Sequence, residues 1–192
     1  MKLRPLDITL AALFAALMAI GANIASFLVI GGVPITLTTF FSILSGLILG
    51  SRLGAISMTV YMLIGFAGAP VFSQFFGGPS VLIRPTFGFI LSYILVAYVA
   101  GKIIERSATK TTYMAGAMIG LAVNYFIGTN WMYLAYQLWL EAPEKIGYAL
   151  AWLWMLPPLP KDIIFSILAG GLAYRIRGTV YKPEKGKGRS IA

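Results

Sequence analysis

The sequence contains neither cysteine nor histidine, and it carries little charge. Without cysteine the chain forms no disulfide and offers no thiolate for metal or nucleophilic chemistry. Without histidine it lacks the commonest general base and metal ligand. Only 6 of the 192 residues are acidic, and they form no carboxylate pair or metal cluster at a recognisable spacing. We therefore expect a protein that is not an enzyme and that uses neither a metal nor a cofactor.

Hydrophobic residues make up 59% of the chain and charged residues 11%, and the mean hydropathy is +0.85. Soluble domains have about 45–50% apolar and about 25% charged residues. Uncharged runs cover residues 8–51, 53–83, 85–101 and 111–140, whereas one helical crossing of a bilayer needs about 20 residues. The composition predicts a multi-pass protein of the lipid bilayer.

Glycine, proline and charge divide the chain into helical spans. The predicted fold is an all-α membrane protein, a compact bundle of six transmembrane helices within one domain of residues 1–179. The spans are 8–28, 37–50, 54–68, 85–104, 112–138 and 161–177. The remaining residues, 180–192, form a basic tail that we expect to be disordered in the cytoplasm.

The distribution of basic residues predicts the orientation. An even number of crossings places both termini on one side, and the loops on that side hold every Lys and Arg except Arg84, Lys145 and Lys161. The positive-inside rule then puts both termini in the cytoplasm. The net charge of +9 is thus explained by topology, and we expect no nucleic-acid partner.

The first span carries a row of small residues. Ala11, Ala15 and Ala19 are spaced by four, so they share one face of a helix. Such a row lets helix backbones approach closely in lipid. Two interpretations are open: packing within this protein, or a docking face for another membrane protein.

A single arginine interrupts the apolar stretch VLIRPTFGFI. Arg84 precedes Pro85, and proline favours the first position of a helix. The arginine would therefore lie at the positive end of a helix dipole, which is unfavourable unless an anion binds there. The alternative is an arginine that only anchors the helix at the lipid headgroups.

The last two spans carry further polar residues. Asp162 follows a proline-rich segment in the first turn of the last span, where it either complements the helix dipole or accepts hydrogen bonds from a ligand. The fifth span contains Asn124, Tyr125, Asn130 and Trp131 in an apolar context. Each of its aromatic residues, taken alone, is explained more readily by packing than by contact with a ligand.

Three segments carry a family resemblance. They are GVPITLTTFFSILSGLILGSRLGAISMTVYMLIGFAGAPVFSQFFGG, RPTFGFILSY and LPKDIIFSILAG. Together they resemble BioY, the biotin-specific substrate-binding (S) component of energy-coupling factor (ECF) transporters, over residues 8–175. The resemblance implies the ECF S-component fold, in the cell membrane of a prokaryote, and biotin as the substrate. It also implies a transmembrane coupling subunit, on which the row of Ala11, Ala15 and Ala19 would dock, and two cytoplasmic ATPase subunits.

With biotin as the ligand, the polar residues acquire expected roles. Asp162 would accept hydrogen bonds from the two ureido N–H groups, and Asn130 or Gln74 would donate to the ureido carbonyl. Arg84 would grip the valerate carboxylate through its planar fork, assisted by Lys161. Which charged residue meets which end of biotin stays open, because Lys161 adjoins Asp162.

The apolar ring of biotin calls for aromatic partners, and we expect Phe75, Tyr125 and Trp131 to cover its faces. Two other functions are open. One is an S component for another vitamin that carries a carboxylate. The other is a membrane scaffold without a small-molecule ligand.

Overall fold

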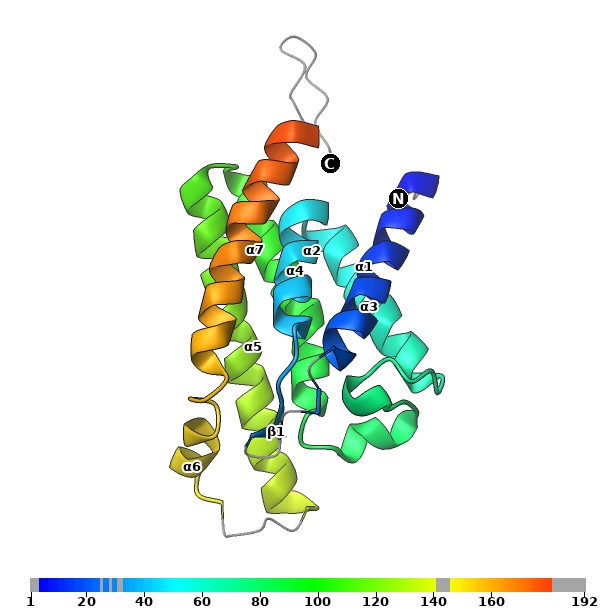
Figure 1. Ribbon diagram of the computed structural model, residues 1–192, viewed down its shortest axis with the longest axis vertical. Helices are drawn as coiled ribbons and strands as arrows, with labels where there is room; N and C mark the ends of the chain where they lie inside the picture. The colour runs from blue at the N-terminus through cyan, green and yellow to red at the C-terminus, as the bar shows by residue number, and fades with distance from the viewer. Residues whose placement is uncertain (1–3, 25, 28, 31–32, 141–145, 181–192) are drawn as a thin grey trace.

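The part of the chain that the computed structural model describes, residues 4–24, 26–27, 29–30, 33–140 and 146–180, forms a bundle of six long helices and one short helix (Figure 1). The helices are α1 (Pro5–Asn23), α2 (Thr38–Leu49), α3 (Ser51–Phe66), α4 (Phe87–Arg106), α5 (Lys110–Leu138), α6 (Tyr148–Leu153) and α7 (Leu159–Val180). The other elements are the strands β1 (Val29–Ile30) and β2 (Val33–Pro34) and the 3-10 helices η1 (Ser73–Phe75) and η2 (Pro79–Ile83).

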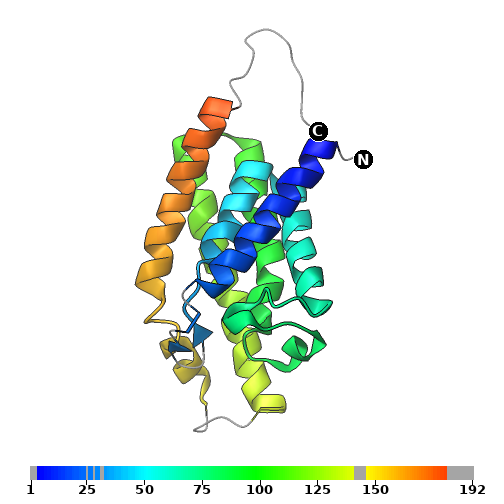
Figure 2. The same cartoon turned by 45° about the vertical axis from the view of Figure 1, so that its right-hand side comes forward.

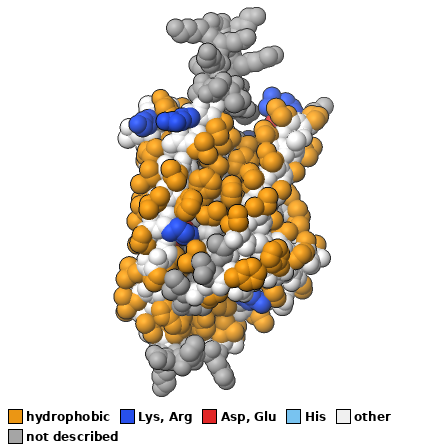
Figure 3. Space-filling model, in the orientation of Figure 1, with side chains coloured by type: hydrophobic (Ala, Val, Ile, Leu, Met, Phe, Trp, Pro, Cys, Tyr) orange, Lys and Arg blue, Asp and Glu red, His pale blue; other side chains and the backbone are white. Residues whose placement is uncertain are grey.

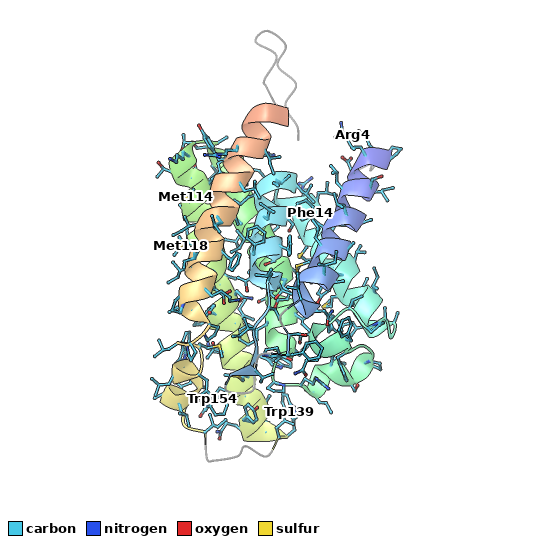
Figure 4. All side chains as sticks on the ribbon, viewed as in Figure 1. Arg4, Phe14, Met114, Met118, Trp139 and Trp154 are labelled. Atoms are coloured by element: carbon cyan, nitrogen blue, oxygen red, sulfur yellow. The ribbon has the colours of Figure 1, made fainter. Side chains whose placement is uncertain are left out.

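The two ends of the bundle differ. The start of α1 and the end of α7 lie at one end, whereas α6, β1 and the end of α5 lie at the other, which we call the distal end (Figures 1 and 2). Side chains follow the same division: Arg4 lies at the first end, and Trp139 and Trp154 lie at the distal end (Figure 4).

The six long helices match the six predicted spans in order, but the first prediction was wrong in extent. Helix α1 ends at Asn23 and not at residue 28. The side-chain amide of Asn23 donates to Ala19 O and also to a loop carbonyl, and such side-chain bonds compete with further helix growth. Beyond it, β1 pairs antiparallel with β2. An apolar run shows that a segment is buried in protein or lipid, not that it is helical throughout.

Glycine allows α2, α3 and α4 to touch at their backbones. A Cβ atom on Gly46 would collide with the backbone of Ala97, and one on Gly101 would collide with the backbone of Ser51. Close backbone approach of this kind is a main source of contact energy between helices in lipid. The turn from α2 to α3 is made at Gly50, whose φ of +86° favours glycine.

Side-chain hydrogen bonds join further pairs of helices. Glu105 on α4 accepts from Ser51 N at 2.8 Å and from Ser51 Oγ at 2.7 Å, so it satisfies the start of α3, where backbone N–H groups lack helical partners. Ser57 Oγ on α3 donates to Ala11 O on α1 at 2.6 Å. These bonds hold α1 and α4 against the short helix α3.

Two described helices, α1 and α4, are long and apolar enough to span a membrane by length and composition, while α2 and α3 are apolar but shorter. The face seen in Figure 3 is covered mainly by hydrophobic side chains between the two ends. Lys and Arg gather on both sides of the end where α1 begins and α7 ends, and a few more lie lower on this face. This distribution fits a protein whose flank contacts lipid.

Candidate functional site

A small cavity of about 60 Å³ lies in the distal half of the bundle. Its walls come from the end of α1, the segment after β2, the end of α3, and the starts of α4 and α7, with the middle of α5 opposite. Polar side chains in its lining are Thr36, Thr38, Tyr61, Ser73, Thr86, Tyr93, Asn124, Tyr125, Lys161 and Asp162. The cavity is thus a polar chamber inside an apolar bundle.

The charged part of the cavity is a cluster around Asp162, which is 7% exposed. Lys161 Nζ lies 2.7 Å from Asp162 Oδ1, and Tyr125 OH donates to Asp162 Oδ2 at 2.7 Å. Lys161 Nζ also donates to Thr36 O at 2.5 Å. The cluster therefore joins α7 to α5 and to the segment between β2 and α2.

A chain of hydroxyl groups continues from this segment. Thr36 Oγ1 lies 2.6 Å from Thr38 Oγ1, which lies 2.6 Å from Tyr93 OH on α4. Tyr93 is 7% exposed, so its hydroxyl needs a partner inside the protein. These three hydroxyl groups give the cavity a second wall that can both donate and accept hydrogen bonds.

Asn124, which also lines the cavity, joins this wall to the neighbouring helices. Its Nδ2 donates to Ser92 Oγ on α4 at 2.7 Å, and its Oδ1 accepts from Thr39 Oγ1 on α2 at 3.2 Å. All three side chains are buried. A buried hydrogen-bond network of this kind holds its members in one arrangement, so it fixes α2, α4 and α5 relative to one another beside the cavity.

Of the eight predicted substrate-binding residues, the structure brings Asp162, Lys161 and Tyr125 together at the cavity. Arg84 is outside the cavity lining. Its guanidinium carbon lies 3.5 Å from the ring centroid of Phe76, and burial lowers its pKa from the ordinary value. It forms a cation–π contact, and α4 begins three residues later, at Phe87, rather than at Pro85 as predicted.

Trp131 packs near Arg84 rather than in the cavity. Its Nε1 donates to Arg84 O at 3.3 Å, and its ring centroid lies 5.1 Å from that of Phe87. The roles expected for Trp131 as a ring cover and for Arg84 as a carboxylate ligand remain predictions.

The other three predicted residues also lie off the cavity lining. Asn130 Nδ2 donates to Phe126 O in its own helix, and its Oδ1 accepts from Tyr148 OH at 3.3 Å. Gln74 and Phe75 form the turn of η1, and Phe75 is 59% exposed. Their expected contacts with biotin stay predictions.

Tyr61 and Tyr93 line the cavity but were not among the substrate-binding residues predicted from the sequence. Both lie in apolar helices, where a tyrosine is usually interpreted as a packing residue. The available signal was the hydroxyl, because a buried Tyr O–H requires a partner. Their helical position alone does not reveal that they face the same chamber.

The alanine row of α1 faces inward. Ala11 and Ala15 are 6% and 5% exposed, and Ala19 packs against the core. Ala11 O accepts the bond from Ser57 on α3. In this structure the row serves packing within the chain, while docking on another protein stays a prediction.

No three His, Cys, Asp or Glu side chains gather as metal ligands within the described ranges. The cavity instead offers one carboxylate, one ammonium and several hydroxyl groups. A largely apolar flank (Figure 3), with a cavity near one end that is lined by several polar side chains, defines the class: a helical membrane protein with a candidate binding site for a small ligand.

The chain was compared with known proteins. The model of the BioY family matches residues 1–182. The putative biotin transporter BioYB of Bacillus subtilis is 42% identical over 94% of this chain and 92% of its own length. The probable biotin transporter BioY of Pyrococcus horikoshii is 38% identical over 90% of this chain and 96% of its own.

A solved structure shows the same fold. The crystal structure of the S-component for biotin from an ECF-type ABC transporter has a TM-score of 0.73, with 19% identity, and the match covers 92% of this chain and 95% of that chain. The protein described above belongs to the BioY family, and it is a membrane protein with the ECF S-component fold.

Proposed function

We propose that this protein captures biotin as the S component of an ECF transporter and is not an enzyme. The observation that carries the proposal is the buried cluster of Asp162, Lys161 and Tyr125 on the cavity of a BioY-family chain. The names of the relatives, biotin transporters, support it.

The hydrogen-bonding capacity of Asp162 fits the ureido ring. An ionised carboxylate has about four acceptor positions, and the described contacts use one oxygen for Lys161 and the other for Tyr125. Capacity remains for two more donors, the number of N–H groups on the ureido ring. Burial strengthens such bonds because no water competes for them.

Lys161 has capacity for a ligand as well. Its ammonium has three N–H donors, of which two are directed at Thr36 O and Asp162 Oδ1. The third can donate to a ligand oxygen. Tyr125 lines the same chamber and offers a ring face to the apolar part of biotin.

The size of the cavity requires the site to widen. Sites for drug-sized ligands usually have about 300–1,000 Å³, and this cavity has about 60 Å³. Thr36 and Ser73 lie in segments of the wall outside the α-helices. We infer that these segments move apart when the ligand binds, since packed helices resist such movement more strongly.

The transport step requires other chains. The sequence lacks the phosphate-binding motif G-x-x-x-x-G-K-[ST] of many ATPases, so we assign energy coupling to two cytoplasmic ATPase subunits and a transmembrane coupling subunit. In this proposal the six long helices cross the prokaryotic cell membrane and both termini are cytoplasmic. The shared end of α1 and α7 and the aromatic residues at the distal end support that topology.

Equilibrium binding to the detergent-purified protein tests the proposal. We expect one biotin to bind per chain, and pantothenate and nicotinate, which also carry carboxylates, not to displace it. Tighter binding of one of these vitamins would favour the alternative S component. Binding of none would refute a role in vitamin capture.

A further inference from the structure

The turn of residues 71–76, called the 71–76 turn below, lies beside the cavity. Phe72 N donates to Phe76 O at 3.0 Å and closes the turn. The buried ring of Phe72 packs edge-on against Tyr61, with centroids 5.5 Å apart. Ser73, within the turn, lines the cavity. The position of the turn therefore fixes the position of Ser73 in the cavity wall.

The turn has a strained backbone. Gln74 has φ 61° and ψ 31°, and Phe75 has φ 55°. Residues with a Cβ atom rarely adopt this left-handed region, and two in succession persist only where their surroundings hold them. The Phe75 ring contributes little to this, because it is 59% exposed and its nearest aromatic partner, Phe27, lies 6.3 Å away.

The last residue of α1 supplies the missing constraint. Asn23 Oδ1 accepts from Phe75 N at 2.7 Å, and Asn23 Nδ2 donates to Val71 O at 3.4 Å. The same Nδ2 donates to Ala19 O at 2.9 Å, which fixes the amide to its own helix. The Asn23 side chain thus forms hydrogen bonds to the turn on both sides of Ser73. Ala22, which precedes Asn23 in α1, lines the cavity.

We propose that Asn23 is a positioning residue for the ligand: its amide holds the strained 71–76 turn against the cavity and so sets how long a bound ligand stays. When the hydrogen bonds of the Asn23 amide break, Gln74 and Phe75 relax to ordinary backbone conformations and Ser73 moves away from the cavity wall. Asn23 also makes the turn respond to any movement of α1. The inference rests on the proposed function, because it takes biotin as the ligand.

The test is the dissociation rate of radiolabelled biotin, chased with excess unlabelled biotin, from purified variants. Asn23→Ala is expected to release biotin about tenfold faster than the unchanged protein, at a similar melting temperature. Because Gln74 is itself predicted to contact biotin, the strain is tested with two substitutions that both remove its side chain. In the Asn23→Ala protein, Gln74→Gly relieves the strain at the turn and is expected to rescue retention, with release about fivefold slower than for Gln74→Ala, which keeps the strained Cβ. A merely structural role for Asn23 would not produce that rescue.

Two further variants keep the test decisive. Thr9→Ala removes a side-chain bond to a carbonyl of the same helix, at the end far from the cavity, and should release biotin at the unchanged rate. Gln74→Gly alone should release biotin more slowly than Gln74→Ala alone, and this comparison tests the strain even where Asn23→Ala does not fold. Unchanged release from Asn23→Ala, together with equal release from Gln74→Gly and Gln74→Ala, would overturn the inference. Failure of the unchanged protein to retain biotin would instead overturn the proposed function.

Discussion

Asp162 and Arg84 are both charged residues near the start of a helix, yet their surroundings differ. Asp162 is 7% exposed and both of its oxygens have partners on the cavity wall. Arg84 is half-buried over the ring of Phe76, outside the cavity lining. Sequence position alone made the two look alike, since each follows or precedes proline at a helix start.

This difference predicts an order of effects on biotin affinity. Asp162→Asn keeps the shape but removes the charge and brings an NH₂ donor toward the ligand's donors, so affinity should fall at least about tenfold, the lower range for a bond to a charged group. Arg84→Ala should cost less than about threefold, as expected for a screened charge near the surface. Titration calorimetry measures both, with Thr59→Ala, which loses only a bond within its own helix, as control. A larger loss for Arg84→Ala would support the carboxylate role predicted from the sequence.

At the scale of elements, α1 shows how one pattern has two explanations. Its alanine row allows close approach, and the structure uses Ala11 and Ala15 against the core. The neighbouring Ala12 and Ala16 are exposed on the same helix. Spacing by four marks a smooth face, but it does not say which surface that face meets.

Substitution of Ala15 separates the two explanations. Ala15→Leu overpacks a buried position, which typically costs about 1–3 kcal/mol, so we expect a lower melting temperature and weaker biotin binding together. Ala16→Leu, on the exposed side, should change neither. Thermal unfolding and biotin binding of the two purified variants make the comparison. Normal stability and binding of Ala15→Leu, combined with lost uptake in cells, would favour docking on a partner.

The prediction of elements succeeded where charge and glycine interrupt the chain. The boundary between α2 and α3 was found because Gly50 and Arg52 stand between two uncharged stretches. The end of α1 was missed because the sequence stays apolar past Asn23. In a membrane protein, apolar residues are suitable for helix, loop and hairpin alike when these are buried.

At the scale of the whole molecule, the cavity is enclosed by segments from almost the entire chain, from Ala22 to Asp162. A ligand held there contacts elements that are distant in sequence. Such a ligand binds the folded state and not the unfolded chain, and therefore stabilises the fold by mass action.

We predict that biotin raises the thermal stability of the purified protein. At a biotin concentration 100 times the dissociation constant, the stabilisation should be about 2.7 kcal/mol, seen as a higher melting temperature. The Asp162→Asn variant at the same biotin concentration should show a smaller rise. An equal melting temperature with and without biotin would contradict the prediction.

The sequence by itself determined that the chain is a mainly helical membrane protein, because long apolar runs are unfavourable in water and a helix satisfies its own backbone hydrogen bonds in lipid. It also indicated Asp162 as a candidate binding residue, since ionisable groups are costly among apolar residues and usually mark a site, but it selected Arg84 as well, which lies off the cavity lining. Only the tertiary structure decided which side chains share the cavity. Rotation of each helix about its axis turned Tyr93 inward and left Asn130 off the cavity, and that rotation depends on packing between helices, which an apolar sequence without a polar face does not encode locally.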